Sequence, residues 1–316
     1  MSKHKVLIIK TGYSEFLEDG NSTKVSYGDV LRVTPLLHYY RDDEVTWLTD
    51  ESALPLLEGN LFIHRLLPLN FHTAMQLQRE QFDTIVNLEK DHDICELSSS
   101  IEAWKRFGFR LDKKTGTVQA YDRAYDVLAV TTSPDMKKKN EKTVQELLFE
   151  LVGAKWNGEE YVLGYKPKTT ETFDVGLNTY IGAKWPTKAW PNNFWDELEK
   201  KLNEEGYRVT RQDKQNKSML TNLHSYIDWV NSSKVLISLD SLGLHVAMAL
   251  KKKVIGLFGP TPHKEVYFYG RGKAILSEVM PECLPCFEPF CRRGKHCMEE
   301  ISPETVYKEA KKFLLK

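Results

Sequence analysis

Short runs of apolar, often β-branched residues recur along the chain and predict β-strands, because polar or turn-forming residues bound each run. In chain order these runs are KVLIIK (5–10), EVTWLTD (44–50), TIVNLE (84–89), FDVGLNT (173–179), YRVTRQ (207–212), KVLISLD (234–240) and VIGLFG (254–259).

Between the runs, apolar residues recur every three or four positions and predict amphipathic helices. The stretches are DVLRVTPLLHYYR (29–41, capped by Asp29), ESALPLLEG (51–59), TAMQLQREQ (73–81), CELSSSIEAWKRFG (95–108), EKTVQELLFELVG (141–153), PNNFWDELEKKLNEEG (191–206), LHSYIDWVNSS (223–233), VAMALKKK (246–253) and SPETVYKEAKKFLLK (302–316). Strands that alternate with helices predict an α/β fold with mostly parallel, doubly wound sheets.

The alternation stops at AKWNGEEYVLGYKPKTTET (154–172), which is rich in glycine, proline and polar residues. We expect this stretch to cross between two domains, an N-terminal one over 1–165 and a C-terminal one over 172–316. The length of 316 residues suits two domains. The run MKKKNEK (136–142) predicts a solvated loop.

Composition narrows the class of protein. Lysine plus arginine and aspartate plus glutamate both number 44, so the net charge is zero, which argues against a dedicated nucleic-acid binder. The first apolar run is too short for a signal peptide, and no run approaches the ~20 residues of a membrane helix. We therefore expect a soluble, cytoplasmic protein. A peripheral contact with a membrane surface stays open, and so does the oligomeric state.

The most informative stretch is LISLDSLGLHVAMALKKKVIGLFGPTP (236–262). A strand ends at Asp240, and a small-residue turn holding Gly243 and His245 leads into a helix. Ligands of doubly wound sheets bind at such strand ends, where the start of a helix presents free N–H groups to anions. We therefore expect a phosphorylated ligand here. The alternative is that Asp240 and Ser241 only cap the helix and that His245 is a core histidine.

This pattern, D-S-x-G-x-H-x-A-x-A followed by LFGPT-P, resembles the donor-binding half of glycosyltransferase family 9, the heptosyltransferases of lipopolysaccharide assembly. Further pieces that look like family motifs follow in family order: GDVLRVTPLL (28–37), EVTWLTD (44–50), KAWPNNFWDEL (188–198) and CLPC…CM ahead of SPETV.

The resemblance implies the GT-B architecture, in which two Rossmann-like domains face each other across a cleft. It places the acceptor mainly on the first domain and the nucleotide-sugar on the second. It implies an inverting transfer that needs no metal, from a donor that is typically ADP-heptose to a glycan, a lipid-linked glycan or a protein.

The resemblance also implies roles for two residues on the reaction path. Asp29, the acid of the GD motif, would be the general base that takes the proton of the acceptor hydroxyl. Lys188 would meet the phosphates of the donor and neutralise the departing diphosphate. The alternatives are that Asp29 is only a helix cap and that Lys188 is a surface lysine. The long loop over 11–27 would form a lid or shape the acceptor pocket.

The remaining donor-site roles follow the same resemblance. Ser241, Leu242 and Gly243 would contact the phosphates, Asp240 would reach the transferred sugar, His245 would lie near the phosphates or brace the turn, and Thr261 would contact the acceptor or line the cleft. The chain departs from the family at Leu242, which stands where the family has glycine, so that Gly243 comes one place later.

Four of the five cysteines lie in PECLPCFEPFCRRGKHCMEE with the spacing C-x2-C-x4-C-x5-C. They are Cys283, Cys286, Cys291 and Cys297. Four thiolates fit a tetrahedral site for Zn²⁺ or a single iron. A branch of the family that modifies autotransporter proteins is similar in holding iron on four cysteines. We expect a structural metal, with reduced thiols, disulfides or an iron–sulfur cluster as alternatives, and we expect Cys95 to be an ordinary buried residue.

Two other functions remain as alternatives. A nicotinamide oxidoreductase lacks support, because no G-x-G-x-x-G follows KVLIIK. The altered DSLG sequence keeps a third function open. In it, the protein is a non-catalytic module that binds glycan or nucleotide, or an interaction module that depends on the metal.

Overall fold

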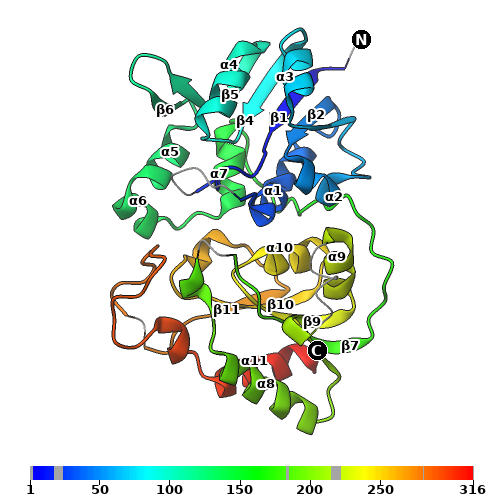
Figure 1. Cartoon of the computed structure of the whole chain (residues 1–316), viewed down its shortest axis with the longest axis vertical. Coiled ribbons are helices and arrows are strands. Elements are labelled where there is room, and N and C mark those ends of the chain that lie inside the picture. The colour runs from blue at the N-terminus through cyan, green and yellow to red at the C-terminus, as the bar shows by residue number, and fades with distance from the viewer. Residues whose placement is uncertain (1–2, 18–23, 183–184, 215–221, 280, 316) are drawn as a thin grey trace. The chain divides into compact units, whose positions relative to one another are not determined.

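The computed structural model describes residues 3–17, 24–182, 185–214, 222–279 and 281–315. The chain divides into two compact units, Met1–Lys166 (unit 1) and Pro167–Lys316 (unit 2), and each unit has its own sheet (Figure 1). The predicted α/β class with parallel sheets is confirmed.

Unit 1 holds a six-stranded sheet with the order β3-β2-β1-β4-β5-β6. Its strands are β1 (Lys5–Ile9), β2 (Glu44–Thr49), β3 (Arg65–Pro68), β4 (Gln81–Asn87), β5 (Glu102–Asp112) and β6 (Thr117–Ala120). All neighbours are parallel except β5 and β6. The central strand β1 is apolar and fully buried from Val6 to Ile9, as expected of a strand covered on both faces.

The helical segments of unit 1 connect these strands. They are α1 (Tyr27–Arg32), η1 (Thr34–His38), η2 (Glu51–Ala53), α2 (Leu54–Leu57), α3 (Phe71–Leu77), α4 (His92–Ser100), α5 (Tyr125–Thr132), α6 (Pro134–Lys139) and α7 (Val144–Leu151). The predicted strands over 5–10, 44–50 and 84–89 and the helices near 51–59, 73–81 and 141–153 are confirmed.

The helix predicted over 29–41 is instead two short pieces, α1 and the 3₁₀ helix η1. Pro35 has no N–H to continue an α-helix, so the chain tightens at Thr34 and Pro35. The prediction that Asp29 is the N-cap is wrong, because Ser26 occupies the cap position and Asp29 lies in the first turn.

The helix predicted over 95–108 is wrong in its second half, which forms the start of β5. This half pairs with β4 in parallel register from Gln81↔Glu102 to Asn87↔Gly108. Gly108 has φ +89°, and a Cβ there would lie 1.8 Å from the Asn87 carbonyl oxygen. Tertiary pairing therefore overrides the helical period of this segment.

The loop predicted over 136–142 is also partly wrong, because α6 covers Pro134–Lys139. Ser133 caps this helix by accepting a hydrogen bond from the Met136 amide, and Pro134 takes its first position.

The segment that leaves unit 1 is hydrogen-bonded to it. The Val162 amide donates to Thr34 Oγ1 at 3.0 Å, and the Gly164 amide donates to the Leu56 carbonyl at 2.8 Å. At the start of unit 2, the Lys168 amide donates to Asp228 Oδ1 at 2.7 Å. The crossing between the units is therefore anchored on both sides.

Unit 2 holds a five-stranded parallel sheet with the order β11-β10-β9-β7-β8. Its strands are β7 (Phe173–Asn178), β8 (Val209–Arg211), β9 (Ser233–Leu239), β10 (Lys253–Leu257) and β11 (Gly272–Ile275). Its helical segments are η3 (Pro186–Lys188), α8 (Asn192–Glu204), η4 (Gln212–Lys214), α9 (Leu223–Asn231), α10 (Leu242–Ala249), η6 (His263–Glu265), η7 (Cys297–Glu300) and α11 (Pro303–Leu314).

Helices cover both faces of this sheet (Figure 1). Helices α8 and α11 pack together on one face, and α9 and α10 lie together on the other. On the α8 face, Trp190 and Trp195 meet edge to face at 4.7 Å within the core. All predicted elements of this half appear, and β11 is an additional strand.

In the described part of the chain, no helix is long and apolar enough to span a membrane.

Candidate functional site

Unit 2 has a topological switch point between β7 and β9. After β7 the chain builds β8 on one side of that strand, and it returns to place β9 on the other side. Crevices at such points, outside the carboxyl ends of the strands, are the usual ligand sites of open α/β sheets. Asn178 ends β7 here, and Asp240 follows β9. The small-residue turn is shorter than predicted, because α10 already begins at Leu242.

Asp240 is the centre of a polar cluster at this point. Its Oδ2 accepts hydrogen bonds from Lys188 Nζ and Thr261 Oγ1, both at 2.7 Å. The side chains of Asp240 and Lys188 are 16% and 14% exposed. Lys188 comes from η3, which follows β7, and Thr261 follows β10, so three loops at one edge of the sheet contribute. The structure thus brings together three of the predicted site residues.

The charge state of Asp240 follows from these neighbours. Burial alone would raise the pKa of this carboxyl, but the Lys188 ammonium, His245 and the Thr261 hydroxyl together hold that pKa well below its usual range. Asp240 is therefore a carboxylate at neutral pH. Lys188 already has one anionic partner, Asp240. A bound anion beside Lys188 would therefore interact with the same ammonium group as Asp240.

The turn around Ser241 has a second polar cluster. The Asn178 amide nitrogen donates to Ser241 Oγ at 2.9 Å, and the Tyr226 hydroxyl donates to Asn178 Oδ1 at 2.9 Å. A Cβ on Gly243 would lie 2.5 Å from Asn178 Nδ2 and from the Tyr226 oxygen. Glycine at this position is thus required by the packing behind the turn. His245 is 5% exposed within α10.

Unit 1 has a corresponding switch point between β1 and β4, because β2 and β3 lie on one side of β1 and β4 and β5 on the other. Lys10 follows β1, and Glu89 lies two residues after β4. Lys10 Nζ lies 2.5 Å from Asp29 Oδ2 and 3.2 Å from Glu89 Oε1. Lys10 and Glu89 are fully buried, and Asp29 is 3% exposed.

Glu89 also holds the chain after β1. Its Oε1 accepts from the Gly12 amide at 2.6 Å, and its Oε2 accepts from the Ser14 amide at 2.8 Å and the Ser14 hydroxyl at 2.5 Å. The first part of the predicted lid over 11–27 is therefore clamped against the sheet edge. Residues 18–23 of that loop lie outside the described residues.

Asp29 is an ionised carboxylate in this setting. Burial would raise the pKa of Asp29, but Lys10, Arg32 and the Phe16 amide outweigh it and lower that pKa. Its Oδ2 accepts from the Phe16 amide at 2.9 Å, whereas Oδ1 has no hydrogen-bond partner among the residues described here. The Arg32 guanidinium lies 3.9 Å from Oδ1. One oxygen of Asp29 thus retains accepting capacity.

The sequence interpretation missed two residues of the unit 1 cluster, Lys10 and Glu89, and two of the cluster around Ser241, Asn178 and Tyr226. Lys10 and Glu89 are the last residues of predicted strands, and Asn178 is the last residue but one of its predicted strand. A polar residue at the end of an apolar run could therefore have been taken as a candidate site residue in each of these strands. Asp240 is the one strand-end residue that the sequence interpretation selected in this way.

The cysteine-rich loop brings four thiols into mutual electrostatic range. Burial and the other three thiols raise the pKa of Cys297 to about 11, and burial raises that of Cys286. Over the described ranges, no group of three or more histidine, cysteine or acidic side chains has the geometry of a metal site. The donor chemistry of four thiols fits zinc or iron. The predicted metal site thus remains a prediction. Cys95 is buried, as expected.

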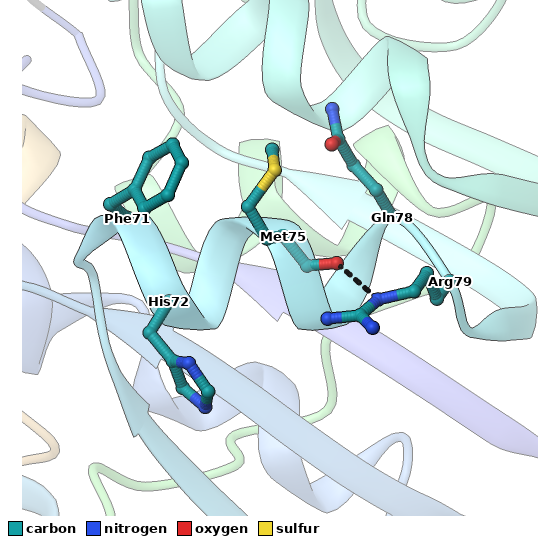
Figure 2. A pocket seen from close by; sticks show the side chains of 5 residues that line it. All are labelled: Phe71, His72, Met75, Gln78 and Arg79. Carbon is teal, nitrogen blue, oxygen red and sulfur yellow. Dashed lines mark hydrogen bonds between the residues drawn. The ribbon is translucent and has the colours of Figure 1, made fainter.

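A shallow hollow lies on the exposed side of α3 in unit 1. It is lined by Phe71, His72, Met75, Gln78 and Arg79, and Figure 2 shows the Arg79 Nε bonded to the Met75 carbonyl. None of the residues in the three clusters around Asp240, Ser241 and Lys10 lines this hollow.

Residues 218–296 match the model of glycosyltransferase family 9 (heptosyltransferase). This segment includes α9, β9, α10 and β10, and hence Asp240 and Thr261. Lipooligosaccharide heptosyltransferase 2 of Campylobacter jejuni subsp. jejuni serotype O:6 (strain 81116 / NCTC 11828) is 31% identical over 80 residues. The match covers 25% of either protein, so the chain spans about a quarter of the length of this relative.

Two solved structures extend the likeness to the whole chain. E. coli ADP-heptose lps heptosyltransferase II has a TM-score of 0.67 at 16% identity, over 99% of each chain. The iron-containing dodecameric glycosyltransferase TibC from enterotoxigenic E. coli H10407 has a TM-score of 0.60 at 13% identity, over 99% of this chain and 76% of TibC. TibC is also described as a heptosyltransferase in complex with ADP-D-beta-D-heptose.

These findings confirm the resemblance to glycosyltransferase family 9. At such identities the solved structures show that the chain has their fold. Each protein named in these comparisons is a glycosyltransferase.

Proposed function

We propose, from the likeness to glycosyltransferase family 9, that this protein is an inverting glycosyltransferase. It moves a sugar, a heptose, from a nucleoside diphosphate donor such as ADP-heptose to a glycan, lipid-linked glycan or protein acceptor. The observation that carries the proposal is the cluster of Asp240, Lys188 and Thr261 at the switch point of unit 2, because Asp240 and Thr261 lie within the segment that matches the family.

The donor would bind at this switch point in unit 2. The start of α10 supplies N–H groups and the positive end of a helix dipole, which favour a diphosphate. Lys188 would add a cation beside the phosphates and neutralise the charge that grows on the leaving diphosphate. Asp240 would accept hydrogen bonds from the transferred sugar, since its Oδ1 makes none of the hydrogen bonds described above.

The acceptor would bind to unit 1, with Asp29 as the general base. As the acceptor oxygen attacks the anomeric carbon, its proton passes to Asp29 and the bond to the diphosphate breaks, which inverts the anomeric centre. Lys10 keeps Asp29 ionised, as a base must be at the start of the step. Transfer requires the two units to present Asp29 and the donor to each other, and this arrangement is part of the proposal.

The cysteine loop would hold a structural Zn²⁺ or iron on Cys283, Cys286, Cys291 and Cys297. The iron of TibC supports this part of the proposal. The metal would stabilise a loop that has little apolar material of its own.

The test is transfer from a panel of nucleotide-sugars, followed by mass spectrometry of the products. Asp29→Asn should retain ADP affinity and lose transfer, because the amide cannot accept the proton. Asp42→Asn, which changes a carboxylate that is 92% exposed, should behave as the wild type. Full turnover by Asp29→Asn would remove the base assignment.

A second candidate is a non-catalytic nucleotide- or glycan-binding module. The observation that favours it is the burial of Asp29 in an ion pair with Lys10, which a purely structural role would also explain. Calorimetric titration with ADP, UDP, GDP and NAD, together with a transfer assay, separates the candidates. Tight ADP binding without transfer from any donor would support the module.

A further inference from the structure

We propose that Asn178 is a positioning residue of the donor site, which sets the Ser241 hydroxyl as a hydrogen-bond donor for an anionic oxygen of the nucleoside diphosphate. The inference rests on the proposed function and adds a residue that the sequence did not suggest. Asn178 ends β7 at the switch point and is fully buried.

Both the nitrogen and the oxygen of the Asn178 side-chain amide are hydrogen-bonded. Its Nδ2 lies 2.8 Å from Ser238 Oγ and 2.9 Å from Ser241 Oγ. Its Oδ1 lies 2.9 Å from the Tyr226 hydroxyl. A buried amide with both ends engaged has a fixed orientation.

The orientation of this amide follows from Ser238. The Ser238 hydroxyl donates its single hydrogen to the Leu239 carbonyl at 2.7 Å. Its oxygen can then only accept from Asn178, so the atom between the two serines must be the Asn178 nitrogen. The reversed amide would place two oxygens together with no hydrogen between them. Tyr226 must accordingly donate to Asn178 Oδ1.

The same nitrogen decides the direction of the Ser241 hydroxyl. Since Ser241 Oγ accepts from Asn178, its own hydrogen points elsewhere. Ser241 is the N-cap residue of α10, but its side chain makes no capping hydrogen bond. Within the described part of the chain, its hydroxyl accepts from Asn178 and donates to no protein acceptor. The hydroxyl is therefore a free donor beside the N–H groups of the helix start. A ligand oxygen that only accepts, such as that of a phosphate, matches this set.

This network also explains why residue 243 is a glycine. Gly243 lies where any Cβ would displace the Asn178 amide and the Tyr226 hydroxyl, each 2.5 Å away. Glycine at position 243 thus leaves room for the Asn178 amide behind the turn.

A double-mutant cycle on ADP affinity tests the inference. Asn178→Asp keeps the size of the side chain but replaces the donor by an acceptor, so Ser241 would turn its hydrogen inward. We expect Ser241→Ala to weaken ADP binding about tenfold, as for a lost hydrogen bond to a charged group. Asn178→Asp should weaken binding about tenfold more in the Ser241 background than in the Ser241→Ala background. Asn203→Asp, an exposed change of the same kind in unit 2, should leave ADP affinity unchanged.

The outcomes separate the inference from the function. If the wild type binds ADP and the two losses are simply additive, the positioning role of Asn178 is wrong while the donor site stands. If the wild type binds no nucleotide, the proposed function fails and takes this inference with it. Should Asn178→Asp not fold, Tyr226→Phe in both Ser241 backgrounds serves instead. Its loss of affinity should be confined to the Ser241 background, and equal losses in both would overturn the inference.

Discussion

Replacing Lys10 by methionine would remove the ammonium that lies between two buried carboxylates at the carboxyl ends of the central strands of unit 1. Lys10 Nζ lies 2.5 Å from Asp29 Oδ2 and 3.2 Å from Glu89 Oε1, and Lys10 is fully buried. Methionine would occupy much of the volume of the lysine side chain, but the negative charges of Asp29 and Glu89 would no longer have an ammonium between them. One of them must then take up a proton or the local structure must open.

The expected cost follows from the burial of the pair. Removing one partner of a buried ion pair destabilises by about 3–5 kcal/mol, because the other charge is left without compensation. An exposed pair is worth about 0–1 kcal/mol. Lys113 and Glu96 form such an exposed pair in the same unit: Lys113 Nζ lies 2.7 Å from Glu96 Oε1, and the lysine side chain is 72% exposed. Lys113→Met is therefore the matched control.

The cost should also depend on pH. In the wild type the pKa of Asp29 is lowered, so its contribution to stability is present above its unfolded value of about 4 and is lost as the pH falls through the folded pKa. In Lys10→Met the pKa of Asp29 would rise, because burial raises it and Lys10 would no longer oppose that effect, and protonation of Asp29 would relieve the repulsion. The difference between variant and wild type should therefore be largest near pH 7 and shrink toward about pH 5.

Hydrogen exchange read by mass spectrometry suits this test, because peptides from β1 and β4 report on unit 1 alone. After correction for intrinsic exchange rates, Lys10→Met should lower the opening free energy of these peptides near pH 7 by several times the effect of Lys113→Met. An equal effect of the two substitutions, or a loss that does not change with pH, would refute the reasoning about the buried charges.

Three further expectations concern unit 2. Gly243→Ala should destabilise the unit by about 1–3 kcal/mol through overpacking and weaken ADP binding, whereas Gly294→Ala, where a Cβ meets nothing within 4 Å, should leave the melting temperature unchanged. Equal melting curves for the two would show that the turn has more room than described. Lys188→Met should weaken ADP binding by about tenfold or more, and calorimetry that found wild-type affinity would place the phosphates elsewhere. Purified protein should carry about one metal per chain by elemental analysis, and a chelator should raise hydrogen exchange over residues 283–297; a metal-free chain with the same exchange would exclude a structural metal there.

The regular part of the fold was predictable because local pattern and tertiary structure agree there. The strands that end at Ile9, Asn87 and Leu239 are short, apolar and bounded by polar residues, and each appears near its predicted place. Two of the failures have identifiable physical causes, one local and one tertiary. Thr34 and Pro35 divide one predicted helix, and residues 102–108 follow the pairing of β4 against their own helical period.

The clusters were less predictable because their partners are distant in sequence. Lys10 and Glu89 are separated by 79 positions, and only the order of strands in the sheet brings them together. Asp240 could be selected from a turn of unusual composition. The part played by Asn178 depends on one hydroxyl hydrogen of Ser238, and no sequence pattern records the direction of such a hydrogen.

The crossing between the units is short, because hydrogen bonds anchor both of its ends. Gly164 is bonded to unit 1 and Lys168 to unit 2, which leaves residues 165–167 between the fixed ends. From the Gly164 amide to the Lys168 amide the chain takes four residue steps, which reach at most about 14 Å, so this crossing is a short connection and not a long flexible tether. Its direction can therefore change only by rotation about the few backbone bonds between these two anchors.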